Sequence, residues 1–549
     1  MKSARNSVKK PATQSTTHST TYSTGWILSC GLLFLALQPC HANAQLTELY
    51  AFQYNAAATS NFPDGENPMA ELIQGTDGNY YTTTNTGGAG TCPGEVEDQI
   101  PGCGAVVKIT PAGVLSVVYS FPYDSATSTA PNGWEPEAGL VQARDGNFYG
   151  VATLGGVSNA ICGTSGCGTV FKLTPGGKLT VLHTFCGGNG CGSLTTDGAD
   201  PTGRLVVGPN GDLYGTTQSG GIYDGFYNQG TIFRISAAGA YTILHLFSGP
   251  FGTTGDGANP VAGLTLGSDG NFYGTTEAGG SGGLDEGEGT VFKMTPAGAV
   301  TILHSFVGSD GGGADGSYPK GALVEASDGH LYGTCYSGGA NGTGTVFRIS
   351  MKGVFTKIYD FPAEGTPDST GNFPRAGLIQ ASDGNLYGTA WEGGASNDGT
   401  IYQVTPAGVG TLEASFSGAT TGFSPLGAAV QGSDGKLYVT LQYDGGENSD
   451  GVQDQGAISV FSSGLPLPAP KILGFAPAKA SVGATITIFG GNFVGTTAVN
   501  FFGDSTSALF KVDGSGILTV IVPSGANSGV ISITNPGGTT SSKLAFTVL

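Results

Sequence analysis

Short runs of alternating apolar and polar residues, each bounded by Gly, Pro, Asn or Asp, follow one another along most of the chain. Over residues 138–185 the order is AGLVQA, an Asp-Gly turn, NFYGVAT, GTVFKLT, a Pro-Gly turn and KLTVLHTF. A period of two is the pattern of a half-buried strand, and Asp-Gly between two such runs indicates a hairpin with a type I′ turn. This stretch therefore predicts four antiparallel strands.

The same unit occurs seven times. Its turns begin at Asp77, Asp145, Asn210, Asp269, Asp328, Asp383 and Asp434. Four-stranded units of about 50 to 70 residues are typical of β-propeller blades. We predict an all-β chain whose body is a seven-bladed β-propeller.

The last strand of each unit indicates how such a ring closes. Its pattern, an aliphatic residue, His or Tyr, any residue and Phe, ends at Phe121, Phe185, Phe247, Phe306 and Phe361, and a weaker copy ends at Phe416, but the seventh unit lacks it. A copy precedes the first unit at Leu49–Phe52. We expect this N-terminal strand to pair with the last blade, since closure removes free sheet edges. Longer loops and crossovers fall on one face, where we expect binding.

The two ends of the chain differ from the repeats. Residues 1–44 contain Lys2, Arg5, Lys9 and Lys10, an apolar stretch from Trp26 to Leu37, and Ala-Asn-Ala before Gln45. This is a signal-peptide pattern. It predicts secretion, to the medium, the cell surface or the periplasm, with no transmembrane segment after its removal. The propeller is expected over residues 45–465, a Pro-rich linker over 466–470 and a second domain over 471–549.

The negative net charge of the chain limits the classes of partner that it can bind. Its formal net charge is −19, and loss of the four basic residues of the leader makes it −23. Nucleic-acid binding requires a cationic surface, so no nucleic-acid partner is expected. We expect a carbohydrate or a protein at the cell surface.

Two parts of the chain resemble known families. The segment DGNLYGTAWEGGASNDGTIYQVTPAG, at Asp383–Gly408, and its six relatives resemble the GloVer tandem repeat of exported bacterial proteins of the choice-of-anchor type. The resemblance implies export and a repeat fold, and no catalytic residues. The segments ILGFAPAKASVGATITIFGGNFVG, VNFFG and VISITNPGG resemble an IPT/TIG domain, which implies an immunoglobulin-like β-sandwich used as a spacer or carbohydrate-associated module.

A repeated DGxxP element offers a candidate metal site. Its acidic residues are Asp64, Asp197, Asp256 and Asp315, with Asn132 as a variant. Because the element precedes the innermost strand, we expect these carboxylates near the mouth of the central channel. They either hold Ca²⁺, the one cofactor that the sequence suggests, or cap their own turns. The residues His183, His245 and His304 alternate with Tyr at one repeat position, which indicates a half-buried structural role.

Other candidates are aromatic residues and cysteines. Trp134, Tyr223, Tyr227 and Trp391 either stack on sugar rings or cover apolar gaps. Close pairs that could form disulfides are Cys92 with Cys103, Cys162 with Cys167 and Cys186 with Cys191, and Cys335 is left over as a partly buried thiol. Export favours oxidation of such pairs.

No catalytic motif is visible, so no catalytic residue is assigned. The function we predict is that of an exported, non-enzymatic binding or display protein that uses its loop-rich face for a carbohydrate or protein partner. One alternative is a propeller hydrolase or lyase that acts on polysaccharide through two carboxylates. Another is a Ca²⁺-stabilised structural surface protein.

Overall fold

The computed structural model describes residues 44–53, 63–89, 102–123, 130–156, 162, 165–185, 197–221, 229–249, 255–280, 287–307, 315–366, 369–418, 420–443, 455–513 and 515–549. Within these ranges the chain is all-β and its strands form ten sheets. No helix in these ranges has the length and hydrophobicity that crossing a bilayer requires. The predicted signal peptide lies outside the described residues, apart from Ala44.

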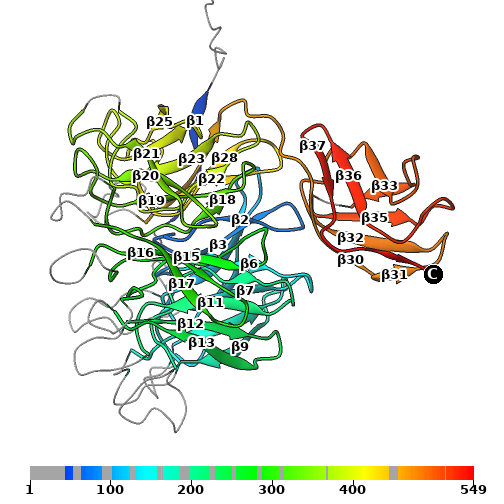
Figure 1. Ribbon diagram of the computed structural model, residues 1–549, viewed down its shortest axis with the longest axis horizontal. Coiled ribbons are helices and arrows are strands. Elements are labelled where there is room, and N and C mark those ends of the chain that lie inside the picture. Colours follow the sequence, from blue (N-terminus) through cyan, green and yellow to red (C-terminus); the bar gives the residue numbers. More distant parts are fainter. Residues whose placement is uncertain are drawn as a thin grey trace, which may run out of the picture. The chain divides into compact units, whose positions relative to one another are not determined.

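Six sheets of the repeat region share one design: four consecutive strands, each antiparallel to the next, in chain order. Figure 1 shows this order in β11, β12 and β13. The first sheet has β2 (Ile73–Gln74), β3 (Tyr80–Thr84), β4 (Ala105–Ile109) and β5 (Leu115–Ser120). The second has β6 (Val141–Gln142), β7 (Phe148–Ala152), β8 (Thr169–Leu173) and β9 (Leu179–Thr184). The third has β10 (Val206–Val207), β11 (Leu213–Thr217), β12 (Thr231–Ile235) and β13 (Tyr241–Leu246).

The next three sheets follow the same design. The fourth has β14 (Thr265–Leu266), β15 (Phe272–Thr276), β16 (Thr290–Met294) and β17 (Val300–Ser305). The fifth has β18 (Val324–Glu325), β19 (His330–Cys335), β20 (Thr345–Ser350) and β21 (Phe355–Asp360). The sixth has β22 (Ile379–Gln380), β23 (Leu386–Ala390), β24 (Thr400–Val404) and β25 (Gly410–Ser415).

The seventh sheet takes its last strand from the start of the chain. It has β26 (Phe423–Pro425), β27 (Val430–Gln431), β28 (Leu437–Tyr443) and β29 (Ala457–Ser462), and β1 (Gln45–Ala51) pairs antiparallel with β29. The register of β1 shifts at Leu49, as that of β9 shifts at Leu182. Because β1 has the bulge of a fourth strand, it occupies a fourth strand's place.

The hairpins form as predicted, but their turns are of a different type. The first closes with Gly78 N–H donating to the Gly75 carbonyl, and Gly78 has φ +88°. Asp77 has no positive φ. This is a three-residue connection, a type I turn followed by a left-handed glycine, and not the type I′ turn that we expected. The Asp77 carboxylate accepts the Asn79 amide N–H and the Tyr81 hydroxyl, which ties the turn to its strand.

Burial follows the order of the strands. The second strand of each of the first six sheets is buried along at least five consecutive residues, and the fourth strand is partly exposed. The aromatic residue after each turn packs between sheets: the Tyr80 and Tyr438 rings of the first and seventh sheets stack with centroids 4.0 Å apart. The apolar core of the repeat region therefore lies between neighbouring sheets.

The C-terminal region has sheets and a core of its own. One sheet has the order β30 (Lys471–Ala476), β32 (Thr485–Gly491), β35 (Ile517–Ile521) and β34 (Phe510–Val512). A second has β33 (Ala498–Phe501), β36 (Ile531–Asn535) and β37 (Gly538–Ser541), and β31 (Lys479–Ala480) pairs parallel with β38 (Thr547–Val548). The core between these strands includes Ile488, Val499, Leu518 and Ile533.

Candidate functional site

One backbone position recurs in all seven sheets of the repeat region, directly before a proline that leads into the first strand. The residue there has a φ between +51° and +57° in every sheet; the seven are Asn67, Glu135, Asp200, Asn259, Tyr318, Phe373 and Ser424. A positive φ is uncommon for a residue other than Gly, and such backbone strain is often found at functional sites.

Two hydrogen bonds hold this conformation. The amide N–H of Phe373 donates to the Thr343 carbonyl of the preceding sheet at 2.8 Å. Its carbonyl accepts the N–H of Trp391, the residue after the second strand of its own sheet, at 3.3 Å. The same pair of bonds occurs in the first six sheets. Each of these sheets thus presents three side chains at one end: those before and after the proline, and that after the second strand.

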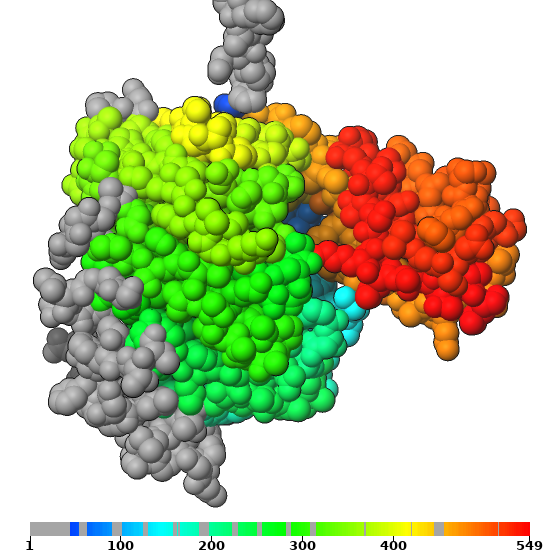
Figure 2. Space-filling model, in the orientation of Figure 1, coloured from blue at the N-terminus to red at the C-terminus, as the bar shows by residue number. Residues whose placement is uncertain are grey.

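In the fifth and sixth sheets these positions hold cations and aromatic rings. The Lys320 ammonium lies 4.9 Å from the centroid of the Tyr336 ring. The Arg375 guanidinium carbon lies 5.3 Å from the Tyr336 centroid and 4.0 Å from that of Trp391. Phe373 packs against Tyr336 at 5.3 Å. All five are half-buried, and we call them the cation–aromatic cluster; the surface of these two sheets runs from green to yellow in Figure 2.

Of the two cations in the cluster, Lys320 has an ion-pair partner and Arg375 has none among the described residues. Lys320 forms an ion pair with Glu277, the equivalent residue after β15, at 2.8 Å. No hydrogen bond or ion pair joins the Arg375 side chain to another residue that the structure describes, and its Nε is buried without a partner, as is Trp391 Nε1. Burial, helped by the charge of Glu364, raises the pKa of Glu392 beside Trp391, and Arg375 opposes this.

In the second and third sheets the same positions hold carboxylates. Burial, together with the charges of Glu135 and Asp200, raises the pKa of Glu137 to about 7, against a hydrogen bond from Thr153 that lowers it. Burial also raises the pKa values of Glu135 and Asp200. We call these three the carboxylate cluster; the charges of Glu135 and Asp200 disfavour ionisation of Glu137 because like charges at close range repel.

The comparisons with known proteins place the repeats in a family. The family profile described as "Gloeobacter/Verrucomicrobia repeat" matches residues 48–280 and 223–453, which is more than half of the chain. This chain belongs to the Gloeobacter/Verrucomicrobia repeat family. The resemblance to the GloVer repeat is thus confirmed, whereas a choice-of-anchor type and an IPT/TIG domain remain predictions. Among curated proteins, none matches the chain.

Solved structures resemble this repeat protein only distantly. A protein provisionally assigned as a gluconolactonase has a TM-score of 0.33 and 12% identity, over 77% of this chain and 92% of that one. A fungal alcohol oxidase in complex with copper has a TM-score of 0.45 and 14% identity, over 91% and 100%. A provisionally assigned glucose dehydrogenase of Thermus thermophilus has a TM-score of 0.34 and 16% identity, over 76% and 100%. We draw no conclusion about activity from them.

The acidic residues of the DGxxP element lie elsewhere in the Gloeobacter/Verrucomicrobia repeats than we expected. Each contacts the His or Tyr of a fourth strand, at the edge opposite the first strand. His183 Nε2 lies 3.0 Å from Asp197, His245 Nε2 lies 2.9 Å from Asp256, His304 Nε2 lies 2.9 Å from Asp315, and the Tyr50 hydroxyl donates to Asp64.

This pairing changes how the two repeated elements are interpreted. Sequence reasoning treated the histidines and the acids separately, but they form one cross-link between a fourth strand and the following crossover. Asn132 bonds to the Tyr119 hydroxyl at 2.7 Å at the same position. Although burial acts to raise it, hydrogen bonds from His245 and Ser248 hold the pKa of Asp256 below its usual value. In the described ranges no three His, Cys, Asp or Glu side chains gather as a metal site would require.

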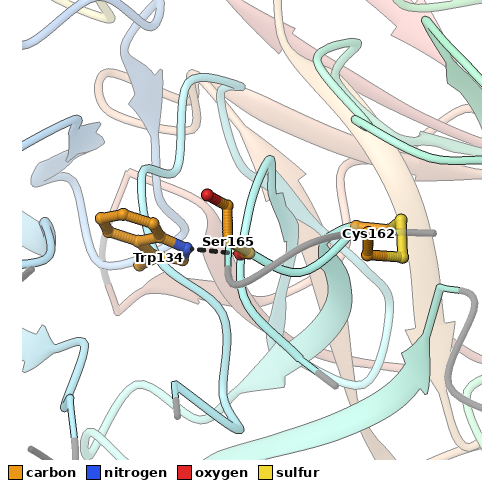
Figure 3. The surroundings of a disulfide bond; sticks show 4 residues. Trp134, Cys162 and Ser165 are labelled. Carbon is orange, nitrogen blue, oxygen red and sulfur yellow. Dashed lines mark hydrogen bonds between the residues drawn. A yellow bond between two sulfur atoms is a disulfide. The ribbon is translucent and has the colours of Figure 1, made fainter. Parts of the chain in front are cut away.

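The aromatic candidates have different surroundings. Trp134 is buried in the apolar core of the first and second sheets, and its indole N–H donates to the Ser165 carbonyl at 2.9 Å, as Figure 3 shows. Its ring is not available to a ligand in this structure. Trp391 belongs to the cation–aromatic cluster. Tyr223 and Tyr227 lie outside the described residues.

The cysteines can be followed in part. Cys162 and Cys167 form a disulfide with their Cα atoms 5.2 Å apart. Cys103 is also disulfide-bonded, and Cys92, Cys186 and Cys191 lie outside the described residues. Cys335 is free and buried, and burial raises the pKa of its thiol, which keeps it protonated and unreactive.

Proposed function

We propose that the seven sheets form a closed seven-bladed propeller that carries its ligand site on one end. The contacts between the last and first sheets support this. The Asn67 N–H donates to the Gln455 carbonyl at 2.9 Å, as equivalent residues do between consecutive sheets. Gln74 and Ser433 exchange two further hydrogen bonds. Together with the pairing of β1 and β29, these contacts join the seventh sheet to the first as consecutive sheets are joined elsewhere.

The domain organisation belongs to the same proposal. Residues 1–44 act as a signal peptide and residues 45–465 as the propeller, followed by the linker at 466–470 and an immunoglobulin-like domain of the IPT/TIG type at 471–549. The separate apolar core of the C-terminal sheets supports an independent domain. The protein is secreted, and the C-terminal domain serves as a spacer.

We propose that the protein is an exported binding protein whose ligand is a carbohydrate. The observation that carries this proposal is the cation–aromatic cluster. The positive φ before the proline occurs in all seven sheets. At the positions around it, only the fifth and sixth sheets carry the Tyr336 and Trp391 rings together with two cations. Aromatic rings beside polar groups with free hydrogen-bonding capacity are the usual composition of a site that orients a small polar ligand.

The test is retention of the full chain on a glycan and polysaccharide array, scored also for released product. We expect retention without product. Trp391→Ala is expected to reduce retention at least about tenfold, because it removes the ring that supports Arg375. Gln218→Ala is the matched control, since Gln218 has the same backbone position in the third sheet. Equal loss in both variants, or no retention of the unchanged chain, would contradict the proposal.

The carboxylate cluster favours one alternative, a hydrolase or lyase that acts on polysaccharide. A carboxyl group with a pKa near 7 can act as a general acid, and Glu137 has that property. Under this alternative the array releases product, and Glu137→Gln abolishes release while retention persists. Product from the unchanged chain would replace the first proposal by this one.

Ca²⁺ stabilisation is a separate proposal from sequence. It predicts that a chelator lowers the melting temperature of the full chain markedly, and an unchanged melting temperature would remove it. In the structure, Asp256 and Asp315 are paired with histidines. These contacts favour the cross-link as their role.

A further inference from the structure

Arg375 lies against two aromatic rings and has no polar partner among the described residues. Its guanidinium carbon lies 4.0 Å from the Trp391 centroid and 5.3 Å from that of Tyr336. Among the described residues, nothing forms an ion pair or hydrogen bond with its side chain, and Nε is buried. The terminal nitrogens Nη1 and Nη2 are not among the buried atoms, so their N–H groups remain available to a ligand.

The surroundings of Arg375 differ from those of other cations that form no ion pair. Lys178 and Lys352 are exposed to solvent, whereas Arg375 is half-buried against aromatic rings. The half-exposed Arg204 pairs with Glu71 at 3.2 Å, and Arg234 contacts Asp212 at 3.8 Å. Arg375 is more enclosed by rings, and a buried donor without an acceptor is costly. An acceptor brought by a ligand would remove that cost.

The groups around Arg375 limit what such a ligand can be. Lys320 contacts the same Tyr336 ring and lies 2.8 Å from Glu277. Glu392 is near enough for the charge of Arg375 to lower its pKa, although burial raises it overall. Trp391 Nε1 is a second buried donor without a partner. The site therefore offers a planar cation for an anion and an acidic oxygen for hydroxyl groups.

We propose that Arg375, assisted by Lys320, binds the carboxylate of a hexuronic acid residue, so that the ligand is an acidic polysaccharide. The inference rests on the proposed carbohydrate-binding function and specifies its ligand class. The carboxylate matches the fork of the Arg375 guanidinium, since the two groups form parallel hydrogen bonds. Glu392 accepts hydrogen bonds from hydroxyl groups of the same sugar, and the rings of Tyr336 and Trp391 exclude water from the ion pair.

The experiment compares two sugars that differ in one group. Binding of trigalacturonate and of its fully methyl-esterified form to the full chain is measured by calorimetry, at low and at physiological ionic strength. We expect the acid to bind at least about tenfold more tightly than the ester, and added salt to weaken only the acid. A glutamate-rich peptide and inorganic phosphate are the parallel probes for the same anionic chemistry from other sources.

Two variants and a control test the residues. Arg375→Gln and Lys320→Gln are each expected to lower the affinity for the acid, with the larger loss, about tenfold or more, for Arg375→Gln. Lys352→Gln is the matched control, because it removes one positive charge from an exposed turn of the fifth sheet. Melting temperatures of all variants show whether any loss of binding comes from unfolding.

The outcomes separate this inference from the proposed function. Equal binding of acid and ester, lost in Trp391→Ala but kept in Arg375→Gln, would overturn the uronate assignment and leave carbohydrate binding intact. Binding of the peptide or phosphate alone would overturn both. Loss of the preference for the acid in Arg375→Gln, with Lys352→Gln unchanged, is the result that supports the assignment.

Discussion

Glu137 is the residue whose surroundings most alter its chemistry. Burial, with Glu135 and Asp200 close by, raises its pKa to about 7 from an ordinary 4.5. The folded protein thus holds a proton there that the unfolded chain has lost. This contribution to stability is complete below about pH 4.5 and is lost as pH rises through about 7. The sheet ends that carry this group are therefore less stable in alkaline than in mildly acidic solution.

Glu137→Gln is expected to stabilise the chain by about 1–3 kcal/mol at pH 8 and to change it little at pH 4.5, because a neutral amide has no charge to bury. The check is the melting temperature of both proteins between pH 4.5 and 8. Asp504→Asn is the control, since hydrogen bonds from Thr506 hold the pKa of Asp504 below its usual value and it stays ionised throughout this range. Parallel curves for Glu137→Gln and the unchanged chain would contradict the raised pKa of Glu137.

The residues of the cation–aromatic cluster were difficult to find from sequence, apart from Trp391. They lie beside a proline or just after a strand, at positions whose residue type varies among the sheets. The residue before a proline ordinarily avoids helical conformations, so nothing in the sequence predicts a positive φ at Tyr318 or Phe373. Comparing the seven copies at the positions flanking that proline is the signal that would have revealed them.

At the level of the strand, the His–Asp cross-link connects a fourth strand to the crossover that follows it. The two partners are 11 residues apart for His245 and Asp256. The sequence shows both elements, but not that they meet, because the intervening segment can place them in many ways. The hairpins were predictable, since their signal is local. The turn type was not, because an Asp-Gly pair fits both a type I′ turn and a type I turn with a following glycine.

The chain itself supplies a substitution that tests the cross-link. Tyr50 bonds to Asp64 where other sheets have His, so His245→Tyr is expected to change stability by less than about 0.5 kcal/mol. His245→Ala is expected to cost about 1–3 kcal/mol, because it leaves the carboxylate of Asp256 without its partner. Chemical denaturation of the three proteins is the measurement. If Tyr and Ala cost the same, the hydrogen bond has no role there.

At the scale of the whole molecule, the account depends on the first strand joining the last sheet. The sequence predicts this from the missing fourth strand of the seventh unit and the extra copy at Leu49–Phe52. The structure pairs Leu46 with Phe461 and Glu48 with Ser459. The packing of neighbouring sheets agrees with this pairing. A Cβ added to Gly113 would lie 2.8 Å from the carbonyl oxygen of Leu49 in β1, and one added to Gly177 would lie 2.6 Å from that of Val118 in β5. β1 thus packs against the first sheet as β5 packs against the second. Without this pairing there is no closed ring, and the candidate sites of different sheets do not lie on one face of a propeller.

Amide hydrogen exchange of the full chain tests this pairing most directly. We predict that the amides of β1 exchange as slowly as those of β28 and β29, because in the proposed propeller β1 cannot open without opening the ring. Fast exchange across Gln45–Ala51, at the rate of a frayed end and independent of β29, would contradict the closed architecture and the common rim on which the proposed ligand site depends.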